Sequence, residues 1–272
     1  MPQPRIKIFT RSFDLKLYRL AKGLFSGWED ASGTPIPCVR LTDRSAHGYF
    51  RAIFADDTCD IAISIEEDCF ITDPGAVLSL VGAVLEGGYA CAGCSDGSPA
   101  TTGRDPVSMS PFFTVLNLGL IRTRLDKKVF RPHAGDAEPY YAFFHWLAAS
   151  FPVLYLPCRK HADGLTTVAM NPQGRPFCLH SWMSRFYYVP SVFVKFFEPG
   201  LGRQKARIDA IIQEAYGLRN KAVPEFGTAD KLAFAGNKLI RWSIKVPQRI
   251  AGWPGKLMRR YGFQVSQVVT WL

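Results

Sequence analysis

Apolar and polar positions in the N-terminal part of the chain predict a strand followed by two helices. Residues 5–10 carry the short apolar pattern of a β-strand. Apolar residues then recur three and four positions apart between residues 17 and 24, which is the spacing of one helix face. Ser12 or Asp14 fits the N-cap position of this helix. After a loop rich in Gly, Ser and Pro, residues 45–54 predict a second helix.

Strands and helices continue to alternate up to residue 156. Residues 60–65 are rich in isoleucine, which suits a strand buried on both faces. Asp73 and Pro74 fit the N-cap and first turn of a helix. Further strands are predicted at 89–94, 112–121 and 153–156, and a helix from 138 to about 150. This alternation predicts an α/β fold with a mostly parallel central sheet and helices on both faces.

The C-terminal part differs in pattern and in charge. Strand signals fade past residue 190, so we expect an α/β domain over residues 1–195 and a helical extension over 196–272. Residues 201–272 hold 13 Lys and Arg against 4 Asp and Glu, whereas residues 1–200 hold 20 against 19. Nearly all of the net charge of +10 therefore belongs to the extension, where it indicates an anionic partner.

Seven cysteines favour reduced thiols and a cytoplasmic protein, because their number is odd and no signal-peptide pattern precedes the first strand. Cys91 and Cys94 form a close pair. Zinc binding or redox chemistry is the functional interpretation of this pair, and two small buried strand residues are the structural alternative. No membrane-spanning helix is predicted, because Pro152 interrupts the longest uncharged run.

Three acids, Glu66, Glu67 and Asp68, follow directly after the strand of residues 60–65. Ligands of parallel α/β sheets bind beyond the carboxyl ends of the strands. Carboxylates buried there are costly without a cation, and Mg²⁺ and Mn²⁺ bind carboxylate oxygens and substrate phosphates. The cluster therefore predicts a divalent metal site, with a solvated acidic turn as the alternative.

The order of elements around these acids resembles the GT-A family of nucleotide-sugar glycosyltransferases. The resemblance covers residues 5–190: strand, acids, Asp-Pro-capped helix, strand, polar loop, strand, acid-opened helix and strand. In that family a D-x-D motif holds the metal that bridges the donor diphosphate, and Glu66-x-Asp68 matches it with Glu in the first place. The resemblance implies that Asp68 is a metal ligand, assisted by Glu66 and by His180, which matches a late histidine of many members.

The resemblance also implies catalytic and donor-binding residues. An acid just before the helix of residues 139–150 would be the general base in an inverting enzyme, and Glu138, Asp136 and Asp96 are the candidates. Capping of that helix is the competing interpretation of Glu138. The donor-binding part would span 1–95 and the acceptor and catalytic part 96–195. Expected donor contacts are Thr10, Arg11, Arg40, Thr42, Asp43, Glu66, Glu67 and, at the leaving diphosphate, Arg185.

We therefore expect a metal-dependent glycosyltransferase that moves a sugar from a nucleotide-diphosphate donor to a glycan or lipid-linked acceptor in bacterial surface-polysaccharide synthesis. Basic residues interleaved with Trp over 238–260 suit an anionic membrane surface, which would place the protein on the inner face of the membrane. No nucleic-acid-binding module is recognised. The alternatives are a sugar-phosphate nucleotidyltransferase, disfavoured because residues 10–14 lack glycine, and a catalytically silent membrane-bound relative.

Overall fold

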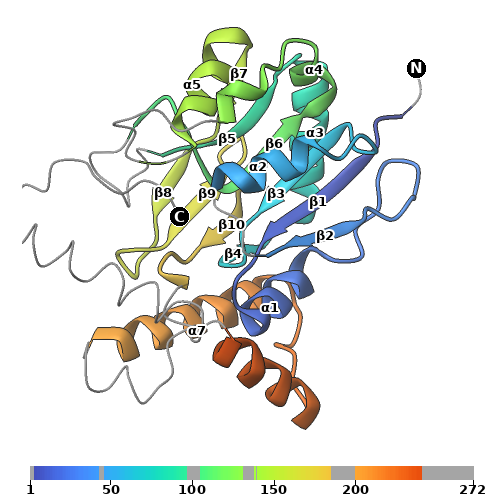
Figure 1. The fold of residues 1–272 in the computed structure, drawn as a ribbon. Helices are drawn as coiled ribbons and strands as arrows, with labels where there is room; N and C mark the ends of the chain where they lie inside the picture. Colours follow the sequence, from blue (N-terminus) through green and yellow to red (C-terminus); the bar gives the residue numbers. More distant parts are fainter. Residues whose placement is uncertain are drawn as a thin grey trace, which may run out of the picture.

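A central β-sheet forms the middle of the fold (Figure 1). The structure is a computed structural model, and it describes residues 3–42, 46–96, 105–130, 138, 140–184 and 200–240. Within these residues the sheet has the strand order β2-β1-β3-β6-β5-β7. Only β6 runs against the other five, because it pairs antiparallel with both β3 and β5. The mostly parallel sheet confirms the expected fold class. The strand bounds are Ile6–Arg11 (β1), Cys38–Leu41 (β2), Ile61–Ile65 (β3), Cys91–Ser95 (β5), Met109–Asn117 (β6) and Val153–Tyr155 (β7).

Helices cover both faces of this sheet, as the alternation of elements predicts. Successive strand residues point to opposite faces, so Ile8 packs into one apolar core and Phe9 into the other. The first core is covered by α1 (Leu15–Phe25) and α3 (Pro74–Glu86). The second is covered by α2 (Ala46–Phe54), α4 (Leu118–Arg122), the 3-10 helix η1 (Lys127–Phe130) and α5 (Tyr141–Ser150).

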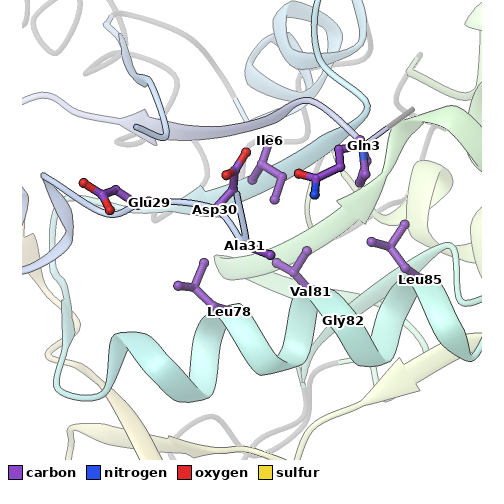
Figure 2. A pocket seen from close by; sticks show the side chains of 10 residues that line it. Gln3, Ile6, Glu29, Asp30, Ala31, Leu78, Val81, Gly82 and Leu85 are labelled. Carbon is purple, nitrogen blue, oxygen red and sulfur yellow. The ribbon is translucent and has the colours of Figure 1, made fainter. Parts of the chain in front are cut away.

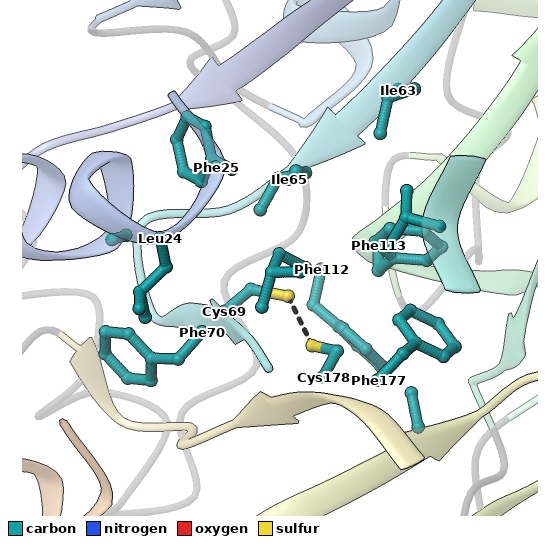
Figure 3. Packing of buried hydrophobic residues seen from close by; sticks show 14 of the residues in the cluster. Leu24, Phe25, Ile63, Ile65, Cys69, Phe70, Phe112, Phe113, Phe177 and Cys178 are labelled. Atoms are coloured by element: carbon teal, nitrogen blue, oxygen red, sulfur yellow. Dashed lines mark hydrogen bonds between the residues drawn. The ribbon is translucent and has the colours of Figure 1, made fainter. Parts of the chain in front are cut away.

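A second, antiparallel sheet with the order β4-β10-β9-β8 extends the first core. Its strands, which the sequence pattern does not predict, are Cys69–Ile71 (β4), Cys158–Lys160 (β8), Thr167–Met170 (β9) and Pro176–His180 (β10). Cys69 and Cys178 meet between β4 and β10 with their Sγ atoms 2.8 Å apart (Figure 3). In the same pairing His180 lies opposite Cys69, which places this histidine beside the end of the acidic cluster.

The C-terminal helices pack against the α/β core. Helix α7 (Gly200–Leu218) buries Ile208, Ile211, Ile212, Ala215 and Tyr216 in the first core. A further helix covers residues 228–240. The described parts of the extension, α7 and residues 228–240, are thus mostly helical. A domain boundary at residue 195 stays a prediction. No helix in the described ranges is both long and apolar enough to cross a bilayer.

Two sequence expectations change in detail. The strand predicted at 112–121 ends at Asn117, because the Asn117 side chain accepts a hydrogen bond from the Leu120 N–H (3.0 Å) and starts α4. Cys91 and Cys94 are both fully buried on β5 but lie in different cores. Because they point to opposite faces of the sheet, they cannot bind one zinc ion together.

Candidate functional site

The three acids form the turn that leaves β3 and enters β4. The Cys69 N–H closes this turn on the Glu66 carbonyl (3.1 Å), and the Ser181 N–H binds the Asp68 carbonyl (2.9 Å). Glu67 and Asp68 are only 2% and 4% exposed. The three carboxylates have three different partners: Arg11 for Glu66, Ser12 for Glu67 and His180 for Asp68.

Glu66, Asp68 and His180 form a candidate metal centre. One ligand atom from each lies within 4.8 Å of the others. Two ligands of one Mg²⁺ or Mn²⁺ ion lie at most about 4.2 Å apart, since each bond is about 2.1 Å. The group is therefore close to the spacing that a bound ion would impose.

The surroundings of His180 support this assignment. Its Nε2 lies 3.5 Å from Asp68 Oδ1, and its buried Nδ1 has no hydrogen-bond partner within the described residues. Phe112 stacks on the ring with centroids 4.3 Å apart, and Trp182 contacts it in a tilted arrangement, also at 4.3 Å. Two carboxylates and one imidazole suit Mn²⁺ better than Mg²⁺, because imidazole is a poorer ligand for the harder ion. The residues present fit a divalent metal.

The electrostatics of the two carboxylates differ. Burial raises the pKa of Glu66, against the opposing effect of its ion-pair partner Arg11. Burial also acts to raise the pKa of Asp68, but the charge and hydrogen bond of His180, with a hydrogen bond from Ser184, outweigh it and lower the pKa. A cation bound between the two carboxylates would favour their ionised forms.

Glu67 points away from this group, toward the turn between β1 and α1. Its Oε2 accepts hydrogen bonds from Ser12 Oγ (2.9 Å) and from the backbone N–H groups of Phe13 and Asp14 (both 2.7 Å). Burial raises the pKa of Glu67 well above its usual value. Because its carboxylate is enclosed and bound to the backbone, Glu67 positions the β1–α1 turn, and its donor contact stays a prediction.

The expected donor-binding residues fall into three groups. Arg11 pairs with Glu66, and Arg40 on the neighbouring strand donates from Nε to Ser12 Oγ (3.1 Å), so both arginines lie at the acidic turn. Thr10 is buried in the strand pair, and Thr42 is exposed. Asp43 and Arg185 lie outside the described residues, as does the candidate base Asp136.

Two candidate general bases, Asp96 and Glu138, lie at the start of α5. Asp96 is fully buried and accepts hydrogen bonds from the hydroxyls of Tyr141 (2.8 Å) and Tyr140 (3.3 Å). Burial raises the pKa of Tyr140, and the negative charges of Asp96, Glu138 and Glu66 add to this effect. The charges of Glu138 and Glu66 therefore both act on the same tyrosine. Glu138 is partly exposed, whereas Asp96 is enclosed and positions α5.

The segment after His180 has an unusual backbone that sequence analysis did not find. Trp182 and Met183 adopt positive φ angles of 56° and 63°, a region that non-glycine residues rarely adopt. Arg207 of α7 donates to the carbonyls of Ser181 and Trp182. It also donates to Asp163 (3.0 Å) and Thr166 (2.8 Å) in the turn between β8 and β9. Arg207 thus holds the strained segment beside the metal centre, a role for which its sequence neighbours give no signal.

A hollow of about 400 Å³ lies at the opposite end of β1 (Figure 2). Leu78, Val81 and Leu85 of α3 face Ile6 across it, and Glu29 and Asp30 lie at its rim. None of the candidate site residues lines this hollow, so it is separate from the acidic site.

Comparison with known proteins gives remote structural likenesses. No family model matches the chain, and no curated protein matches its sequence. The solved structures that share some likeness include A197 from STIV, with 15% identity over 64% of this chain and 93% of that chain and a TM-score of 0.38. They also include the mannosyltransferase PcManGT from Pyrobaculum calidifontis, solved in complex with GDP-Man and Mn²⁺, with 11% identity over 88% of this chain and 81% of that chain and a TM-score of 0.41. At these values neither likeness assigns a family or a function.

Proposed function

We propose that this chain is a metal-dependent glycosyltransferase that uses a nucleotide-diphosphate sugar. The observation that carries the proposal is the convergence of Glu66, Asp68 and His180 at the carboxyl end of β3, with Arg11 beside them. Ligand sites of parallel sheets lie at this edge. The element order that resembles the GT-A family supports the same function.

Glu66, Asp68 and His180 would hold the metal, which when bound neutralises charge on the donor diphosphate. Arg11 adds a fixed positive charge next to this group, and Glu67 fixes the turn from which Arg11 and Ser12 project. The acceptor hydroxyl attacks the sugar C1, the bond from C1 to the diphosphate oxygen breaks, and the nucleoside diphosphate leaves. Glu138 takes the hydroxyl proton in an inverting reaction.

The acceptor in this proposal is a glycan or a lipid-linked sugar, as in surface-polysaccharide assembly, and the protein acts at the inner face of the membrane. The basic C-terminal part supports an anionic surface as a partner. The proposed ion is Mn²⁺, with Mg²⁺ as the alternative.

Replacement of the central ligand tests the proposal. Nucleoside diphosphates at 100 times their Kd, with Mn²⁺, should raise the free energy of unfolding of the wild type by about 2.7 kcal/mol. Asp68→Asn should abolish this increase. Glu86→Gln, at an exposed acid near the end of α3, is the matched control and should keep it. Unchanged affinity in Asp68→Asn would refute the metal centre, and binding without any Mn²⁺-dependent donor hydrolysis would indicate a catalytically silent protein.

A further inference from the structure

One face of the helix of residues 228–240 contacts α1. Asp230 forms an ion pair with Arg19, whose guanidinium also lies 5.3 Å above the Phe234 ring. Phe234 packs edge to face on Phe226 with ring centroids 4.9 Å apart. Asn237 accepts a hydrogen bond from the Leu15 N–H at the start of α1 (3.1 Å). Positions 230, 234 and 237 lie on one side of a helix, so this side is the inner face.

The outer face of the same helix is apolar and exposed. Leu232, Leu239 and Ile240 are 69%, 68% and 62% exposed. Leu232 and Leu239 are seven residues apart, and the exposed Ala235 lies between them on the same side. Scattered apolar surface residues are ordinary, but large apolar residues at helical spacing form an ordered stripe.

Lysines border this stripe and converge on a hollow of about 490 Å³. Lys231 and Lys238, also seven residues apart, line it together with Lys16 of α1, and the rings of Phe226 and Phe234 form its apolar wall. Glu225 is the acid among the lining residues. Lys238 is half-buried, and this burial lowers its pKa. Within the described ranges, none of the three ammonium groups has a carboxylate partner at ion-pair distance.

We propose that this basic apolar face, made of Lys16, Lys231, Lys238, Leu232 and Leu239, binds an anionic lipid bilayer. A lipid phosphate occupies the hollow between the lysines, and the leucines enter the boundary between head groups and acyl chains. Interfacial helices combine these two contributions, apolar burial and attraction to anionic lipid. Lysine stems lie along apolar surface while their charged ends reach phosphate. Charge complementarity favours a bilayer over a second copy of this chain, because two copies would bring the same lysines together.

The position of this face bears on the proposed function, although its lipid binding does not depend on that function. Lys16 is two residues from Asp14, whose backbone N–H binds Glu67 of the acidic turn. Lys238 and Lys16 both act on the carboxylate of Asp14. A bilayer on the basic apolar face would therefore lie next to the acidic site, where a membrane-borne acceptor could reach it.

Sedimentation with vesicles tests the proposal on the full chain. The wild type should sediment with phosphatidylcholine vesicles that contain phosphatidylglycerol, but only weakly with pure phosphatidylcholine, and 0.5 M salt should release it. The variant Lys231→Gln/Lys238→Gln should bind roughly 30-fold more weakly, since each basic residue contributes a factor of about five. Leu232→Ser/Leu239→Ser should lose at least tenfold through smaller apolar burial. Arg159→Gln/Lys160→Gln, on the exposed strand β8, is the charge-matched control and should bind like the wild type.

Several outcomes would overturn the proposal. Equal binding of the Lys231/Lys238 variant and the control variant would place the lipid contact elsewhere. Inorganic phosphate that competes with vesicles at equal phosphate concentration would identify a site for free phosphate instead of a bilayer. The Leu232→Ser/Leu239→Ser variant could instead bind vesicles like the wild type and differ only in its sedimentation coefficient without vesicles. That result would identify the face as a contact between copies of the chain. The affinity for nucleoside diphosphates with Mn²⁺ is measured on the same variants. If this affinity is present but vesicle binding is absent, only the lipid proposal fails. If vesicle binding is present but this affinity is absent, only the proposed function fails.

Discussion

Arg207 offers the sharpest test of how the C-terminal helix supports the candidate site. Its guanidinium connects α7 to the turn between β8 and β9 and to the backbone that follows His180. The perturbation is Arg207→Ala, and Arg203→Ala on the same helix is the matched control because Arg203 is exposed. The comparison isolates the contacts of one arginine from the effect of removing a charge.

The expected size of the effect follows from the burial of the ion pair. The side chains of Arg207 and Asp163 are only 13% and 16% exposed, and their closest atoms are 3.0 Å apart. Removal of one partner from a buried pair costs about 3–5 kcal/mol, because the other charge is left without compensation. We expect about 3 kcal/mol for Arg207→Ala, since both side chains keep some contact with solvent. Arg203→Ala should change the free energy of unfolding by less than about 0.5 kcal/mol.

Urea unfolding measures both variants, and Mn²⁺ titration measures the consequence for the site. Loss of the groups that orient a metal ligand typically weakens metal binding by about 10–100-fold, so Arg207→Ala should bind Mn²⁺ at least tenfold more weakly. The double variant with Asp163→Asn completes a cycle whose coupling energy should be 1 kcal/mol or more, on the order expected for contacting residues. If Arg207→Ala unfolds at the same urea concentration as Arg203→Ala, the support of the site by α7 is refuted.

Three further predictions concern single carboxylates. Glu138→Gln should lower turnover by about 10²–10⁴ and leave urea unfolding nearly unchanged; turnover within a few-fold of the wild type would assign the base to another residue. Glu67→Ala should reduce the free energy of unfolding by about 3 kcal/mol or more, because three hydrogen-bond donors lose their acceptor. Glu67→Gln keeps an acceptor oxygen and should cost less. A cost below about 1 kcal/mol for Glu67→Ala would contradict the positioning role. The hydrogen bond from Arg5 lowers the pKa of Asp60 to about 2, so this carboxylate stabilises the fold above its unfolded pKa of about 3.8 and loses the effect as pH falls toward 2. Asp60→Asn should therefore cost at most about 1 kcal/mol near pH 7, after allowance for solvent exposure, and progressively less as pH falls below about 4 and through 2, as followed by urea unfolding at each pH.

Local patterns in the sequence predict much of this fold. Helix α1 begins at Leu15 with Asp14 as its N-cap, and α3 begins at Pro74 with Asp73 as its N-cap. These features depend on neighbouring residues and on apolar periodicity, both of which are visible in the chain. Strand β4 was not predicted, because a three-residue strand is too short to show a period, and its pairing partner β10 lies more than 100 residues away.

Some residues of the candidate site can be predicted from local sequence, and others depend on contacts that the sequence does not show. The acids of residues 66–68 were found because they follow a buried strand, and the resemblance to the GT-A family added His180. The different directions of Glu66 and Glu67 were not predictable, because they depend on the turn geometry and on the donors of the β1–α1 turn. Tyr140, Tyr141 and Arg207 were missed because they act through contacts with residues far away in the chain.

The packing of α7 on α1 has a consequence for the synthesis of this protein. Tyr216 donates a hydrogen bond to the Leu20 carbonyl, 196 residues earlier in the chain, and Asn237 binds Leu15 across 222 residues. At a translation rate of 5–20 residues per second, the apolar surface of α1 that α7 covers stays open for about 10–40 s after α1 has been made. Such an interval is long compared with chain collapse, which takes at most about 100 μs in chains of ~100 residues. The nascent N-terminal half therefore exposes this apolar surface until the C-terminal helices emerge. We expect chaperones that act on the ribosome to bind it during this interval.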